Sequence, residues 1–181
     1  MGCDTLAACI LPAGHLGMSK HIANCFWLML PPLAISGLLG GALPPVYQPD
    51  VFWLDIPAII GWPETVFRLL VTGLPLLLPL GIAAPRQRWG IGIYALGVLA
   101  YGLSWWPLIA APQSVWSTSL IGFAAPAYTP LLWLAGIGLV GMTGAIGWRR
   151  WVALGYAASA AIFLLCHNLH TLLIWQRHFA G

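Results

Sequence analysis

Residues 152–175 read VALGYAASAAIFLLCHNLHTLLIW and contain no Asp, Glu, Lys or Arg. A helix needs about 20 mostly apolar residues to cross the roughly 30 Å hydrocarbon core of a bilayer. This stretch is long and apolar enough, so it predicts a transmembrane helix. It also carries His167 and His170, three positions apart, and ionisable side chains inside a membrane are candidates for a functional site.

The rest of the chain has the same character. Of its 181 residues, 60% are hydrophobic and 6% are charged, and the mean hydropathy is +0.88. Soluble domains carry about 25% charged residues, so this composition is typical of a multi-pass membrane protein. We therefore predict an all-α fold, a polytopic bundle of about five transmembrane helices. The predicted spans are about 22–44, 64–84, 90–110, 119–147 and 152–175.

These spans form one transmembrane domain over residues 22–175, between an N-terminal tail of residues 1–21 and a C-terminal tail of residues 176–181. The links between spans hold Arg86 and Arg88, and then Arg149 and Arg150. Basic residues concentrate in cytoplasmic links, so we expect a cytoplasmic N-terminus and a C-terminus outside. Such a protein fits a cell membrane such as the bacterial inner membrane.

The ends of the first two spans raise two smaller expectations. Residues 51–62 are apolar but too few to cross a bilayer, so we expect a short segment lying on the outer surface, with the second span beginning at Pro63 and Glu64. Residues 1–17 lack a basic export signal, and we expect an interfacial tail or an over-extended start.

Helical periodicity divides the last span into two faces. At 100° per residue, Ala158, Ile162, Leu165, Leu169 and Leu172 fall on one side. The other side gathers Tyr156, Ser159, Phe163, Cys166, His167 and His170. We expect the first face to meet lipid and the second to face the protein, which places both histidines inside the bundle.

A second polar stripe lies on the predicted second span. Glu64, Arg68 and Thr72 recur every four residues and continue into Pro75 and Pro79. Residues four apart share a helix face, so Glu64 and Arg68 can form an ion pair. We predict that this stripe and the histidines converge on an outward-facing, aromatic-walled pocket. The candidate ligand-binding residues are Glu64, Arg68, Tyr101, Tyr128, His167 and His170.

The histidine pair itself has three interpretations. The two side chains can be hydrogen-bonding groups that hold helices together, they can handle a ligand or proton, or they can bind a metal or haem. As a metal site, His167, His170 and Glu64 would make a set of two histidines and one carboxylate, provided that the second and fifth spans are neighbours. The sequence leaves these alternatives open, and it identifies no cofactor.

Two classes of function remain. The first is a membrane protein that binds a small molecule or ion for transport, sensing or delivery. The second is an accessory or scaffold subunit of a larger membrane complex, redox or photosynthetic, in contact with partner subunits or a second copy of itself. A formal charge of +3, scattered along the chain, gives no nucleic-acid footprint. No phosphate loop, GxSxG or HExxH motif points to a standard enzyme.

Overall fold

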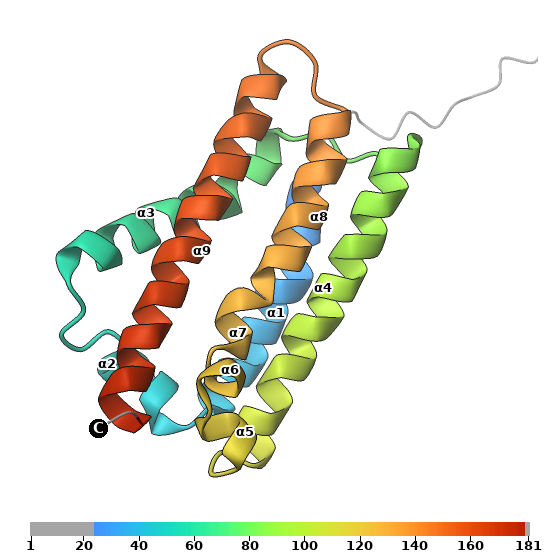
Figure 1. The fold of residues 1–181 in the computed structure, drawn as a ribbon. Coiled ribbons are helices and arrows are strands. Elements are labelled where there is room, and N and C mark those ends of the chain that lie inside the picture. Colours follow the sequence, from blue (N-terminus) through green and yellow to red (C-terminus); the bar gives the residue numbers. More distant parts are fainter. Residues whose placement is uncertain (1–23, 180–181) are drawn as a thin grey trace, which may run out of the picture.

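The computed structural model describes residues 24–179, and every regular element within that range is helical (Figure 1). The all-α bundle is therefore confirmed. The N-terminal expectation for residues 1–17 lies outside the described residues. The elements, in chain order, are η1 (Cys25–Met29), α1 (Leu30–Leu39), η2 (Gly40–Ala42), η3 (Pro45–Tyr47), α2 (Pro49–Phe52), α3 (Ala58–Gly73), η4 (Leu74–Leu77), α4 (Pro85–Ala110), α5 (Val115–Thr118), α6 (Leu120–Phe123), α7 (Ala125–Tyr128), α8 (Pro130–Thr143) and α9 (Arg149–Phe179).

Four helical segments of the described chain are long and apolar enough to cross a membrane. They are Cys25–Ala42, Pro85–Ala110, Ala125–Thr143 and Arg149–Phe179. These segments match the first, third, fourth and fifth predicted spans and give the chain the character of a multi-pass membrane protein. The predicted second span corresponds to α3 with η4, which is not among the four, so a count of five stays a prediction.

The bounds of α3 differ from those expected. The helix begins at Ala58, and Pro63 lies inside it instead of at its start. Pro57 precedes the first turn. Residues 58–62, which we expected in a separate surface segment, therefore form the beginning of α3. The helix α3 ends at Gly73 and is followed by the 3-10 helix η4, which ends at Leu77. Residues 78–84 are not helical. Pro75 and Pro79 lack the backbone N–H that would continue the helical hydrogen bonds.

The bundle has two distinct ends (Figure 1). Arg86 and Arg88 lie where α4 begins, and Arg149 and Arg150 lie where α9 begins, at the same end of the bundle. The short helix α2 and the C-terminal end of α9 lie at the opposite end. This arrangement agrees with the expected cytoplasmic side for the four arginines, and the orientation itself stays a prediction.

The helices α4 and α8 pack closely because glycines face each other. A Cβ atom on Gly97 would lie 2.4 Å from the Trp133 backbone nitrogen, and one on Gly136 would lie 2.6 Å from that of Tyr94. Such approaches are possible only without side chains, as in other membrane helix pairs. By contrast, Gly37, Gly41 and Gly155 have no atom within 4 Å of such a Cβ.

The second pair consists of α3 and α9, and α3 runs obliquely across α9 (Figure 1). The buried face expected for α9 is confirmed, and contact of the other face with lipid stays a prediction. Tyr156, Ser159 and His170 are buried, whereas Leu165 and Leu169 are exposed. The polar stripe on α3 also faces the protein, since Glu64 and Pro75 are buried.

The fourth predicted span is broken into α6, α7 and α8 by two prolines, Pro126 and Pro130. A proline frees carbonyl groups that must find other donors. Asn168 of α9 donates its side-chain amide to the carbonyl of Ala127, 3.2 Å away. The break is thus stabilised by a side chain from a neighbouring helix.

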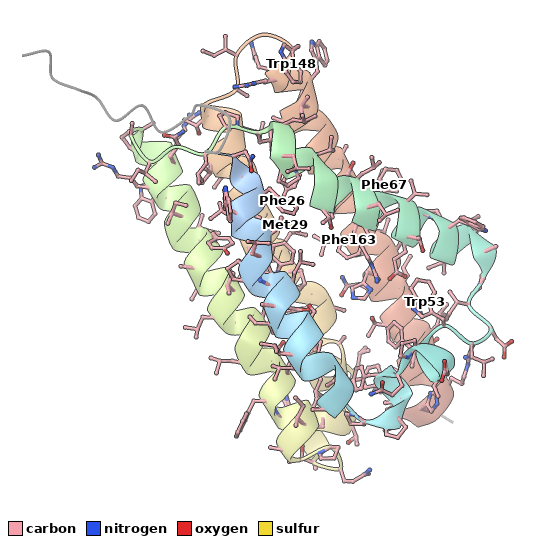
Figure 2. The ribbon with its side chains drawn as sticks, turned by 180° about the vertical axis from the view of Figure 1, so that it is seen from behind. Phe26, Met29, Trp53, Phe67, Trp148 and Phe163 are labelled. Carbon is pink, nitrogen blue, oxygen red and sulfur yellow. The ribbon has the colours of Figure 1, made fainter. Side chains whose placement is uncertain are left out.

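Hydrogen bonds to segments outside these two pairs tie the bundle together at both ends. At the arginine end, the backbone N–H of Cys25 donates to the carbonyl of Leu78 at 2.9 Å. At the other end, the indole N–H of Trp175 donates to the carbonyl of Thr118 at 2.9 Å. The two pairs also contact each other directly, since Tyr156 of α9 donates its hydroxyl to the carbonyl of Leu134 of α8 at 3.0 Å. Figure 2 shows Met29 just before α1 and Phe163 on α9.

Candidate functional site

Glu64 is the centre of a polar cluster between α3 and α9. Its carboxylate is fully buried, and each oxygen has a partner on α9. Oε1 lies 2.9 Å from Nδ1 of His167, and Oε2 lies 2.6 Å from Nδ1 of His170. Arg68, one turn further along α3, donates from Nη2 to Oε1. One carboxylate therefore links its own helix to two positions of α9.

His170 is held at both ring nitrogens. Its Nδ1 contacts Glu64, and its Nε2 lies 2.7 Å from the backbone carbonyl of Phe52. The carbonyl only accepts, so Nε2 carries a hydrogen and donates it. The side chain is 0% exposed and packs between the rings of Phe52 and Trp53, with ring centroids 4.3 and 4.7 Å away. His170 thus fastens the segment around α2 to the bundle.

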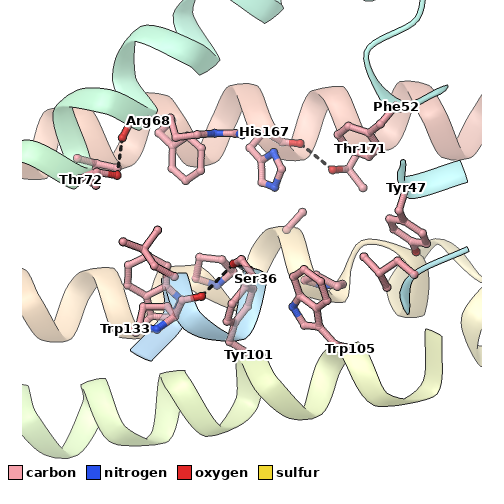
Figure 3. Close-up of a pocket in the computed structure, with 18 of the residues that line it drawn as sticks. Ser36, Tyr47, Phe52, Arg68, Thr72, Tyr101, Trp105, Trp133, His167 and Thr171 are labelled. Carbon is pink, nitrogen blue, oxygen red and sulfur yellow. Dashed lines mark hydrogen bonds between the residues drawn. The ribbon is translucent and has the colours of Figure 1, made fainter. Parts of the chain in front are cut away.

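His167 is different, because only one of its nitrogens is occupied. Nδ1 donates to Glu64 Oε1, which already accepts from Arg68, and Nε2 has no hydrogen-bond partner among residues 24–179. A carboxylate on one nitrogen fixes the tautomer of an imidazole and leaves the other nitrogen as an acceptor. Figure 3 shows the ring projecting from α9 toward the side of the bundle that carries Tyr101, Trp105 and Trp133.

Arg68 is the accessible charge of the cluster. Its side chain is 44% exposed, whereas the Glu64 side chain is 0% exposed. The guanidinium carbon lies 5.7 Å from the ring centroid of Trp53 and 5.5 Å from that of Phe163, within the range of cation–π attraction. Its buried Nε–H has no partner among the described residues. The Nε–H group of Arg68 can therefore still donate a hydrogen bond to a ligand.

Arg68 and His167 both line a cavity of about 380 Å³ between the two helix pairs (Figure 3). A cavity of this size falls in the range that holds small molecules. Its wall is mainly aromatic and aliphatic. The aromatic side chains that line it, apart from His167, are Tyr47, Phe52, Trp53, Tyr101, Trp105, Phe123, Trp133 and Phe163.

The wall opposite His167 carries neutral hydrogen-bonding groups. The hydroxyls of Ser36 on α1 and Tyr101 on α4 lie 2.8 Å apart, and Ser36 also donates to the carbonyl of Pro32. Trp133 on α8 lines the same wall, and its buried indole N–H has no partner among the described residues. The cavity thus has a cationic side and a neutral, hydroxyl-bearing side.

The segment from Pro49 to Asp55 covers one side of the cavity. Besides the contact between Phe52 and His170, it is fastened by Arg177 near the end of α9, whose Nη1 donates to the carbonyl of Leu54 at 2.6 Å. Asp55 has a φ of 54°, a left-handed conformation that an aspartate tolerates in a tight turn. The turn brings the chain from α2 back toward α3.

The structure brings together five of the six candidate residues. Glu64, Arg68, His167 and His170 form one hydrogen-bonded cluster, and Tyr101 lines the cavity beside it. Tyr128 does not line the cavity. It is 40% exposed on α7 and its hydroxyl donates to the carbonyl of Ile121. Its neighbours Pro126 and Ala127 do line the cavity, so the Tyr128 side chain lies on the other side of α7.

The geometry does not suit a metal shared by the two histidines. Each Nδ1 contacts a different oxygen of Glu64, and Nε2 of His170 is used by Phe52. Among residues 24–179, no group of three or more His, Cys, Asp or Glu side chains is arranged to hold a metal ion. Cys25 and Cys166, the two described cysteines, are buried free thiols, as packing residues would be.

Several residues of the site were missed by sequence reasoning. The acceptor for His170 is the main-chain carbonyl of Phe52, and no residue type predicts a backbone partner. Ser36 lies in a span without charged residues, and its role depends on the contact of α1 with α4. The aromatic residues Phe52 and Trp53 carried a usable signal, since they lie in the apolar segment that was predicted to lie on the outer surface between two spans.

Comparisons of the chain with models of known protein families, with curated proteins and with solved structures find no match.

Proposed function

We propose that this protein binds a small molecule inside the membrane, in the cavity between the α3 and α9 pair and the α4 and α8 pair. The observation that carries the proposal is the cavity of about 380 Å³ with a largely aromatic wall, into which one accessible cation and one unused imidazole nitrogen project. Binding sites for small molecules combine an apolar wall with a few polar groups that fix orientation. Transport, sensing and delivery all begin with such a binding step.

The position of the polar groups supports a ligand with two different ends. Arg68 and His167 lie on the α3 and α9 side of the cavity, and their cluster is already fixed by Glu64. Rigid polar groups bind a ligand without first losing side-chain entropy. The apolar part of the ligand then contacts rings such as Tyr47, Phe123 and Phe163. We place the site in the half of α9 nearer its C-terminus, which is the outer half in the predicted topology.

A matched pair of threonines on α3 tests the proposal. Thr72 and Thr65 each donate a hydroxyl to the carbonyl four residues earlier, but Thr72 lines the cavity and Thr65 is exposed. Binding of 1-naphthylacetate to purified protein at pH 6 can be followed by calorimetry. We expect Thr72→Phe, which fills part of the cavity, to weaken binding at least about tenfold, equivalent to roughly 1.4 kcal/mol. Thr65→Phe should bind as the wild type does, and equal binding by all three proteins would contradict the proposed site.

A further inference from the structure

The hydrogen bonds of the cluster determine how many protons it holds. Nε2 of His170 donates to the Phe52 carbonyl, and the 2.6 Å contact between Nδ1 and Glu64 Oε2 requires one proton between the two atoms. That proton can sit on the imidazole, giving a carboxylate and an imidazolium, or on the carboxyl, giving two neutral groups. In both cases Glu64 and His170 together carry no net charge.

The remaining two groups then set the charge facing the cavity. Arg68 is always protonated and contributes one positive charge. His167 donates from Nδ1 to Glu64, so it is neutral as long as Nε2 has no hydrogen. The cluster as a whole therefore carries a single positive charge, located on Arg68 beside a cavity whose other walls are apolar or neutral. A charge in such surroundings favours a ligand of opposite sign.

The free nitrogen of His167 adds a second condition. Nε2 of the neutral ring is an acceptor, so it repels an anionic oxygen but accepts a hydrogen bond from an acid O–H. If that proton passes from the ligand's oxygen to Nε2, the products are an anion and an imidazolium, with Arg68 as a second partner for the anion. No electron is exchanged, and the proton that leaves the acid is the one gained by His167.

We infer that the ligand of this cavity is a monocarboxylic acid with an apolar body, bound as its anion together with one proton on His167. The inference rests on the proposed binding function and specifies its ligand class and its proton dependence. The aromatic wall accommodates the apolar body, and Arg68 and His167 hold the two carboxylate oxygens.

The other titratable groups near His167 do not replace it in this role. On α3 they are Glu64 and Arg68, and on α9 His170, all of which are fixed by the bonds described above. Tyr101 of α4 shares its hydroxyl with Ser36. Tyr47 of η3 donates to the carbonyl of Phe123, and burial raises the pKa of its phenol, so it stays neutral. The cavity-lining residues of α1, α2, α7 and α8 include no Asp, Glu, Lys, Arg or His.

The test compares an acid with its neutral amide. Calorimetry on the purified wild-type protein measures the Kd of 1-naphthylacetate and of 1-naphthylacetamide between pH 6.5 and 8.5. Uptake of one proton per anion predicts that the Kd of the acid rises about tenfold per pH unit, or about 100-fold over this range, because solution acid is ionised throughout. The Kd of the amide should not change with pH. Decanoate, an acid of the kind that partitions into a bilayer, should bind with the same slope if lipid is the source, and an absence of decanoate binding assigns the ligand to the aqueous phase.

Two variants locate the proton. His167→Gln can still donate an N–H to the anion but cannot take up a proton, so its Kd for the acid should become independent of pH. His178→Gln alters a histidine that does not line the cavity and whose one hydrogen bond among residues 24–179 is to the carbonyl of Ile174, so it should keep the wild-type slope. A flat Kd for the acid in the wild type, or a wild-type slope in His167→Gln, would overturn the inference and leave the proposed function standing. Binding of neither naphthyl probe would contradict the proposed function itself.

Discussion

Glu64 is the residue whose removal should damage this fold most. In Glu64→Ala, Arg68, His167 and His170 lose one partner at the same time, and the donors of His170 are completely buried. Removing one member of a buried charged pair costs about 3–5 kcal/mol. Because the Arg68 side chain is 44% exposed, we expect the lower end, about 3 kcal/mol. That is a large part of the roughly 5–15 kcal/mol by which a folded domain is stable.

Glu64→Gln should be much milder, because the amide can satisfy the same partners. Its oxygen accepts from Arg68 and His167, and its N–H donates to Nδ1 of a neutral His170, which still donates Nε2–H to Phe52. Only the extra strength of charged hydrogen bonds is lost, which we put at about 1 kcal/mol. The control is Asp50→Asn, an exposed acid on α2, with a change below about 0.5 kcal/mol.

The measurement is the free energy of unfolding of each purified variant in mixed micelles, titrated with a denaturing detergent and followed by far-ultraviolet circular dichroism. The expected order of stability is wild type and Asp50→Asn, then Glu64→Gln, then Glu64→Ala. The reasoning is refuted if Glu64→Ala lies within about 1 kcal/mol of the wild type, because the three contacts would then contribute no more than ordinary intramembrane hydrogen bonds. Equal losses in the Gln and Ala variants would also refute it, since the amide would not be satisfying the cluster.

Three further predictions concern the packing, the cover and the topology. Gly97→Ala should lose about 1–3 kcal/mol in the same unfolding assay, because its Cβ would meet the Trp133 backbone at 2.4 Å, whereas Gly92→Ala, with open space, should lose nothing. Arg177→Gln should speed hydrogen exchange in residues 49–57 with little loss of global stability. Arg149→Gln, at the other end of α9, should leave exchange in this segment unchanged. Unchanged exchange in Arg177→Gln would show that other contacts hold the segment. Reporter fusions after Arg88 and after Arg150 should both indicate the cytoplasm, and a signal from the opposite side at either position would reverse the predicted topology.

The sequence alone determined the features that depend on composition and on spacing within one helix. Low charge and long apolar runs indicate a membrane protein. In lipid, backbone N–H and C=O groups must be paired within helices or closed barrels, and the runs have the length of membrane-spanning helices. The periodicity of an α-helix placed His170 and Tyr156 on the buried face of α9. The same periodicity predicted the pair of Glu64 and Arg68, since residues four apart must be neighbours on a helix.

Only the tertiary structure decided which helices are neighbours. Gly97 and Gly136 allow α4 to pack closely against α8. The helix α3 packs against α9, where the carboxylate of Glu64 contacts both His167 and His170. Contacts between segments about a hundred residues apart follow from the packing of all the helices together, and no local pattern encodes them. The same reason explains why His170 bonds to a backbone carbonyl and why His167, on the same face of the same helix, keeps a nitrogen free toward the cavity.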